Sequence, residues 1–418
     1  MKHYKNVSQI PRPAKFVLSP AMHLFYLGLV VIGVAAFAWG LKYDAPRVWH
    51  NYLLNYFYWL TLSLSGLFFM ALQYITSSMW SAPLKRVPES FISFLPVAFI
   101  LMLFPFIGMF SEIFSYFHFG HGGHPSGGMT LLYEWTHNEA VANDSVLEGK
   151  TPYLNLGFFL ARNVFSFLIW MGFGFFLVRN SLKQDLTGSV ALTRFNKKIA
   201  APFLLLFALT YTVASFDWLM SLEPHWFSTV FGVYCFAGLF ESGMALTILF
   251  VIALRRQGAF KDVINENHLH DLGKLMFAFC VFWTYIAFSQ YMLIWYGNLP
   301  EEIGYMIRRT EGSWTPVALA LLFGKFVVPF FMLISRPAKR NENYLLFVAV
   351  WVLAAQYLDV YWMIYPVLGA KPVFGFQEVG LFLGFLGLFV LNACLFLQRV
   401  SPVAMKDPRL LDGVNHHQ

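Results

Sequence analysis

Two carboxylates stand inside apolar stretches of this sequence, each seven residues before a proline. Asp217 precedes Pro224 at the end of a run that begins near Ala201, and Asp359 precedes Pro366 in the same way. A carboxylate within a hydrocarbon-length helix is costly, so such residues usually face a bundle interior or a water-filled path. The chemistry open to them there is proton uptake and release, or pairing with a cation.

A cation precedes each of these acids in the neighbouring apolar stretch. Arg162 lies in the run before that of Asp217, and Lys325 lies in the run before that of Asp359. The arrangement predicts two interhelical pairs, Arg162 with Asp217 and Lys325 with Asp359. Such pairs can carry protons, or they can simply fix the register of the helices, and the residue types leave both readings open.

Two further acids fall in apolar runs. Glu112 lies near one end of its run, where an interfacial anchor is almost as good an interpretation as a site role. Glu241 lies near the middle of its run and is the deepest carboxylate of the chain. No cation matches Glu241 in the pattern above, so we treat it as a separate proton-pathway candidate.

The composition places these residues in a membrane. Of 418 residues, 58% are hydrophobic and only 12% are charged, about half the charge of an ordinary soluble domain. A membrane span needs roughly 20 apolar residues. Ten runs reach that length, at about 19–41, 50–77, 90–117, 155–180, 199–222, 226–254, 272–296, 314–335, 343–366 and 375–398. We predict an all-α, polytopic membrane protein.

The lysines and arginines of the connecting segments predict the orientation. Twenty of them lie in the segments on the side of the N-terminus and six lie on the other side. Positive charge accumulates on the cytoplasmic side, so both termini are predicted to be cytoplasmic. The net charge of +7 therefore reflects topology and does not indicate nucleic-acid binding.

Helices 2–5 and 6–9 read as two copies of one four-helix unit. The matches fall in the same order on successive helices: Ser65-Gly66 with Ser242-Gly243, Glu112 with Gln290, Arg162 with Lys325, and Asp217 with Asp359. A repeated four-helix unit keeps its direction, as in parallel repeats related by an axis along the membrane normal. We predict a tail at 1–18, a flanking helix at 19–49, bundles at 50–222 and 223–366, and a flanking helix with a cytoplasmic tail at 367–418.

Cofactor ligands are scarce in the sequence. The three cysteines, Cys235, Cys280 and Cys394, lie singly in apolar runs, and no C-x-x-C motif occurs. The outer loop 118–154 begins with three histidines, at 118, 121 and 124, but no carboxylate or cysteine stands beside them. We expect no metal and no cofactor held by this chain alone.

The segments F-D-W-L-M-S-L-E-P-H-W (216–226) and F-S-Q-Y-M-L-I-W-Y-G-N-L-P-E-E (288–302) carry a family resemblance. Together with ten spans in two bundles, they resemble the NrfD/PsrC-like quinone-interacting membrane subunits. The two segments look closer still to those of the ActF-type subunit of bacterial alternative complex III. The resemblance extends over essentially the whole chain.

The resemblance implies a subunit of a quinol:electron-acceptor oxidoreductase in the bacterial inner membrane. The expected partners are a paralogous NrfD-like subunit and multihaem cytochrome c and iron–sulfur subunits that carry haem c and Fe–S clusters, with a terminal oxidase as a further candidate. Menaquinol or ubiquinol would be the reductant. The quinol site is usually assigned to the sibling ActC-type subunit, and the F-type subunit is expected to supply a proton pathway or a scaffold. Carried over by position, Asp217 and Asp359 are the candidate proton carriers, with Glu112, Arg162, Glu241 and Lys325 as neighbours.

Two other functions fit the same residues. The parallel repeat and the charges within the membrane also suit a stand-alone secondary transporter. A purely structural anchor, with ion pairs that only set register, is the third reading. No catalytic residue of its own is predicted for the chain.

Overall fold

The computed structural model describes residues 3–11, 13–107, 128–260 and 262–417. Within them, ten helical segments are long and apolar enough to cross a membrane. They match the ten predicted runs, and the prediction of an all-α, multi-pass membrane protein is confirmed. Glu112 and the histidines at 118, 121 and 124 lie outside the described residues.

Most spans are single helices, and two are built from shorter pieces. The single helices are α1 (Pro20–Tyr43), α2 (Ala45–Ile75), α9 (Leu156–Thr187), α10 (Val190–Trp218), α11 (Phe231–Arg256), α12 (Glu266–Gly297), α17 (Glu342–Ile364) and α18 (Phe376–Arg399). The composite spans are α3 (Arg86–Ile92) with α4 (Leu95–Leu103), and α14 (Thr315–Leu321) with η7 (Leu322–Val327) and α15 (Val328–Leu333). Short helices lie between the spans: α6 (Gly128–Leu132), α7 (Asn138–Asn143), α8 (Ser145–Lys150), α13 (Pro300–Thr310) and α16 (Arg336–Arg340). A further short helix, α19 (Leu410–Val414), follows α18.

Several helices continue beyond the apolar runs that predicted them. The run at 272–296, for example, becomes a helix that begins at Glu266. Its start is capped by Asn265, whose side chain accepts from the backbone of His268 while the His268 ring approaches the Asn265 backbone N–H. A cap fixes where a helix begins, whereas hydropathy marks only the part that crosses hydrocarbon.

Two helices form the centre of the molecule. The most apolar windows of α2 and α11 are 94% and 89% buried, whereas those of the other spans are 56% or less. The two helices pack on each other, with α3, α9 and α10 around α2 and α12 and α17 around α11. At their contact, a Cβ on Gly243 would lie 2.3 Å from the Ser65 side chain, so one residue of each matched Ser-Gly pair lies where α2 and α11 meet.

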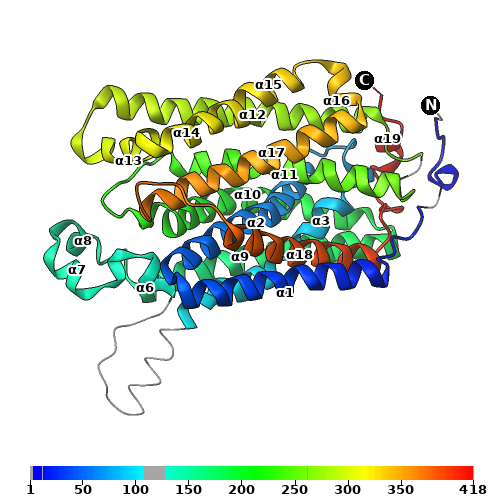
Figure 1. The fold of residues 1–418 in the computed structure, drawn as a ribbon. Coiled ribbons are helices and arrows are strands. Elements are labelled where there is room, and N and C mark those ends of the chain that lie inside the picture. The colour runs from blue at the N-terminus through cyan, green and yellow to red at the C-terminus, as the bar shows by residue number, and fades with distance from the viewer. Residues whose placement is uncertain (1–2, 12, 108–127, 261, 418) are drawn as a thin grey trace, which may run out of the picture.

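The first and last spans pair with each other. A Cβ on Gly33 of α1 would lie 2.5 Å from the Cα of Gly384 in α18, so the two backbones are in close contact. Both helices also pack on α2. The two flanking helices predicted from the sequence therefore lie together, against α2 (Figure 1).

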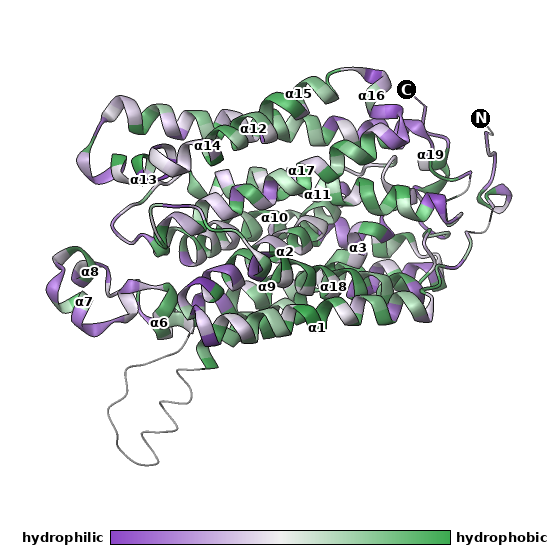
Figure 2. Ribbon diagram, in the orientation of Figure 1, coloured by the Kyte–Doolittle hydropathy of each residue, from purple (hydrophilic) through white to green (hydrophobic). Residues whose placement is uncertain are grey.

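Both chain termini lie at one end of the bundle, and α6–α8 and α13 lie at the other (Figure 1). We call these the termini end and the loop end. Hydrophobic residues fill the middle of the helices, and hydrophilic residues gather towards both ends (Figure 2). The backbone hydrogen bonds of each helix are internal, which is what lets it cross hydrocarbon.

Candidate functional site

The first predicted ion pair forms near the loop end, between α9 and α10. Arg162 Nε and Nη2 donate to the two carboxylate oxygens of Asp217 at 3.0 and 2.8 Å. Asn163 adds a third hydrogen bond to this carboxylate at 3.3 Å, and the Tyr153 ring lies 3.8 Å from the guanidinium carbon. A two-pronged pair with these extra contacts has a fixed geometry.

The second predicted pair forms inside the other half of the molecule. Lys325 Nζ donates to Asp359 and, at 2.5 Å, to the side-chain oxygen of Gln356. The hydroxyl of Tyr234 in α11 donates to the other oxygen of Asp359. The ammonium also lies 4.2 Å from the centre of the Trp283 ring, and every one of these residues is buried. A lysine, an acid, an amide and a phenol thus meet in one buried cluster.

A break in helix geometry positions Lys325. Residues Leu322–Val327 form a π-helix between two α-helical segments. Two of the carbonyls in this stretch have side-chain donors, since Trp351 Nε1 donates to Gly324 at 2.7 Å and Cys280 Sγ donates to Lys325 at 3.3 Å. Single π-helical turns inside α-helices often occur at functional sites, because they turn one side chain out of the regular register.

Glu241 is a buried carboxyl group without a hydrogen-bond partner. Neither of its oxygens is hydrogen-bonded to any residue that the structure describes, and the residue is fully buried. Lys325 and Asp359 are close enough to act on it electrostatically. It lies two helical turns from Tyr234 on α11, so both side chains lie on one face of that helix.

Gly238 brings the cluster and Glu241 together. A Cβ at this position would lie 2.6 Å from Gln356 Oε1 and 2.9 Å from Nε2, so the amide rests directly on the backbone of α11. Gly238 lies between Tyr234 and Glu241 on the helix. The polar side chains therefore form a line through the second bundle from Tyr234 and Asp359, past Lys325 and Gln356, towards Glu241. We call these five residues the α11 file.

The structure brings five of the six predicted residues into two groups. Arg162 and Asp217 form one pair, and Lys325, Asp359 and Glu241 belong to the α11 file. Glu112 lies outside the described residues. Sequence reasoning did not select Tyr234, Gln356 or Trp283. Gln356 could have been found, because it stands three residues before Asp359 and so shares its helix face.

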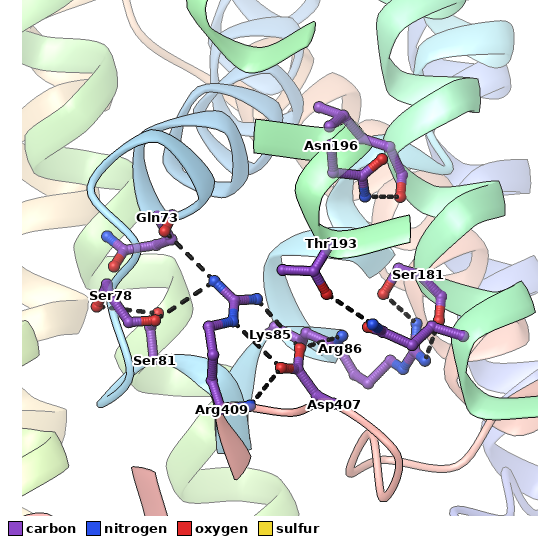
Figure 3. Close-up of polar contacts among 12 residues, drawn as sticks. Gln73, Ser78, Ser81, Lys85, Arg86, Ser181, Thr193, Asn196, Asp407 and Arg409 are labelled. Atoms are coloured by element: carbon purple, nitrogen blue, oxygen red, sulfur yellow. Dashed lines mark hydrogen bonds and ion pairs between the residues drawn. The ribbon is translucent and has the colours of Figure 1, made fainter. Parts of the chain in front are cut away.

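A second polar cluster, also not predicted, lies at the termini end (Figure 3). Arg86 of α3 pairs with Glu89 and with Asp185 of α9, and Ser181 donates to Glu89 at 2.5 Å. Beside it, Lys85 donates to Asp407 at 2.6 Å, and Arg409 contacts the same carboxylate at 3.1 Å. Burial acts to raise the pKa of Asp407, but the two cations outweigh it and hold the pKa well below the usual carboxyl range.

A pocket of about 580 Å³ adjoins the α11 file. Its walls come from α11, α12, α13, α14, η7 and α17, and Tyr234, Trp283 and Gln290 all line it. Gln290 is the residue that the repeat matches with Glu112. The file is therefore reachable from a cavity at its Tyr234 end.

Comparison with known proteins adds no family to this picture. No protein-family model matches the chain, and no curated protein matches it significantly.

Proposed function

We propose that this chain is a membrane subunit of a quinol-oxidising respiratory complex and that the α11 file carries protons through it. The main support for a proton pathway is the state of Glu241. This carboxyl group is fully buried, and neither of its oxygens is hydrogen-bonded to a described residue. A purely structural acid in such a place would be paired, because an unpaired buried carboxylate is very costly. A buried carboxyl group without a hydrogen-bond partner is therefore better suited to carrying a proton than to a structural role.

The Lys325–Asp359 pair is the ion pair of the α11 file. Lysine, unlike arginine, is a residue type that proteins use to take up and release protons, so on this proposal the Lys325–Asp359 pair is the part of the α11 file that exchanges a proton with Glu241. The hydroxyl of Tyr234 and the amide of Gln356 link to the pair and keep its atoms in place. A proton that enters at Tyr234 can thus pass to Asp359 and reach Glu241 through a rearrangement within the file.

The quinol-oxidising complex is proposed on the resemblance to ActF-type subunits in 216–226 and 288–302. On this proposal the electrons move through haem c and Fe–S clusters on partner chains, next to a paralogous membrane subunit. Both termini would then lie in the cytoplasm of the bacterial cell, as the loop charges predict. The Arg162–Asp217 pair would fix helix register.

Substitution of Glu241 tests the pathway. Glu241→Gln should leave the complex assembled with its full haem content, because the amide keeps the volume and removes a costly charge. Proton movement per electron, followed with a pH-sensitive dye in vesicles, should fall several-fold, since an amide cannot take up and release a proton near neutral pH. Glu241→Asp, which keeps a carboxyl group, should recover part of the coupling. Normal coupling in a fully assembled Glu241→Gln complex would exclude Glu241 as a carrier.

One observation favours a stand-alone transporter as a second candidate. The span of Lys325 is interrupted by the π-helix η7, and transporters commonly place interrupted helices at their binding sites. Purification in a gentle detergent separates the two functions. Haem absorbance that co-purifies with the chain supports the complex, and a colourless chain that is stable alone supports the transporter.

A further inference from the structure

Another pocket lies at the termini end, between the N-terminal tail and the end of α18. Its volume of about 510 Å³ is within the range of small-molecule sites. The tail supplies one wall, which includes Val7, Ile10 and Lys15. The end of α18 and the segment after it supply the other wall, which includes Arg399 and Ser401. We call this cavity, shared by segments from opposite ends of the chain, the tail pocket.

The tail pocket carries positive charge. Lys15 and Arg399 line it, and no acid stands among the lining residues that the structure describes. Both cations are exposed, and neither forms an ion pair with an acid in the described ranges. By contrast, Lys85 and Arg409 at the same end of the bundle both pair with Asp407. The tail pocket therefore offers two cations whose counter-charge the described chain does not supply, and this suits an anionic ligand.

The two cations lie where a span gives way to the polar tails. Arg399 is the last residue of α18, and Lys15 stands five residues before α1 begins at Pro20. Apolar surface follows at once, because Val17 and, in α1, Leu24 are each 70% exposed. In a membrane, basic side chains at the end of a span meet the phosphate layer, and exposed apolar side chains of the span meet acyl chains. A ligand that matches both features has a phosphate at one end and a hydrocarbon chain at the other.

We propose that the tail pocket binds the head group of an anionic phospholipid, with its phosphate near Lys15 and Arg399 and its acyl chains along the exposed side of α1. A zwitterionic head group fits less well, because its ammonium would meet two cations and no described acid. Ser8 and Gln398 add neutral polar side chains to the lining that can bond phosphate or glycerol oxygens. The proposal goes beyond the proton pathway and does not depend on it, since no residue of the α11 file lines this pocket.

Native mass spectrometry of the purified full-length chain, with the partners that it retains, tests this proposal. The probes are dioleoyl phosphatidylglycerol, dioleoyl phosphatidylcholine and inorganic phosphate, each added after delipidation in a neutral detergent. Phosphatidylglycerol should fill a site that phosphatidylcholine does not, and an excess of inorganic phosphate should not displace it. Equal retention of the two lipids would mean that only bulk lipid contacts the pocket. Displacement by phosphate would make the pocket a site for a free anion. Either result overturns the proposal.

Substitution of the two cations locates the site. The double variant Lys15→Gln with Arg399→Gln should retain one phosphatidylglycerol molecule fewer per chain. Each single change should weaken binding at this site about fivefold, which corresponds to about 1 kcal/mol for one cation near an anionic membrane surface. The unfolding temperature without lipid should stay the same, because both side chains are exposed and have no acidic partner among the described residues.

Lys198→Gln is the matched control, because Lys198 is an exposed lysine near the start of α10 that is outside the described lining of the pocket. This control should retain as much phosphatidylglycerol as the unmodified chain. A double variant that also retains the full amount would overturn the proposal. Lipid retention is measured without turnover, so its failure is distinct from a failure of proton coupling in Glu241→Gln.

Discussion

At the scale of single residues, the two ion pairs have different chemistry. Arginine is the residue type that stays charged in proteins. Arg162 donates two parallel hydrogen bonds to Asp217. Lys325 shares its single ammonium group between an acid and an amide. The first arrangement is a fixed two-pronged pair, whereas the second is centred on a lysine, a residue type that proteins also use as a proton donor or acceptor. The sequence match between the pairs does not therefore make their roles equal.

Asp217→Asn should harm folding more than function. The change strands the Arg162 cation, whose side chain is only 9% exposed, and should cost about 3–5 kcal/mol of stability, measured by thermal unfolding in detergent. The double variant Arg162→Gln with Asp217→Asn removes both charges and should recover most of that loss. Activity per assembled complex should stay normal in both. A stable Asp217→Asn chain with poor proton coupling would instead make Asp217 a carrier.

At the scale of elements, the α11 file depends on how closely two helices approach. Gln356 of α17 reaches Lys325 only because Gly238 of α11 has no side chain in its way. The π-helix η7 then supplies Lys325 from a third helix. The cluster therefore depends on the relative positions of α11, α17 and η7, and an added group as small as a methyl between α11 and α17 would disturb it.

Gly238→Ala should disrupt this approach. The added methyl would overlap the Gln356 amide, which is expected to cost about 1–3 kcal/mol and to weaken proton coupling. Gly172→Ala is the matched control, because a Cβ at this position in α9 meets nothing within 4 Å. That change should be neutral or stabilising by up to about 1 kcal/mol. Equal unfolding temperatures for the two variants would contradict the close approach.

The sequence predicted the spans and both ion pairs because their signals are local or repeated. Apolar runs of membrane length mark helices directly, and the matched order of Arg162 with Asp217 and Lys325 with Asp359 pairs the charges. The π-helix has no such signal, because a single wide turn depends on donors such as Trp351 that approach from another helix. Tyr234 reads as ordinary aromatic packing until Asp359 is seen against its hydroxyl.

At the scale of the whole molecule, the C-terminal tail is fastened to the termini end of the bundle. Asp407 holds Lys85, which lies just before α3, and Arg409 reaches the backbone of Gln73 and Ser78 beside the end of α2 (Figure 3). Tyr4 and Asn415 also exchange two hydrogen bonds, at 2.9 and 2.7 Å. Both tails are thereby joined to each other and to the first bundle.

This fastening should weaken in acid. The folded state lowers the pKa of Asp407, so its contribution to stability is complete above the unfolded carboxyl value of about 4 and is lost as the pH falls below it. Asp407→Asn should lower the unfolding temperature at pH 7 and reduce its dependence on pH below about 4. The measurement is a series of thermal scans between pH 3 and 7. An unchanged slope in the variant would show that Asp407 is not the acid-sensitive group.

The pairing of α1 with α18 sets the order in which the protein can be completed during synthesis. The small-residue face of α1 around Gly33 is ready as soon as that span leaves the ribosome, but its partner, α18, is made more than 300 residues later. Until α18 arrives, that face and the adjoining side of α2 meet lipid or a chaperone. A nascent chain that does not yet include α18 therefore leaves this small-residue face uncovered, and α18 closes this side of the bundle when it inserts.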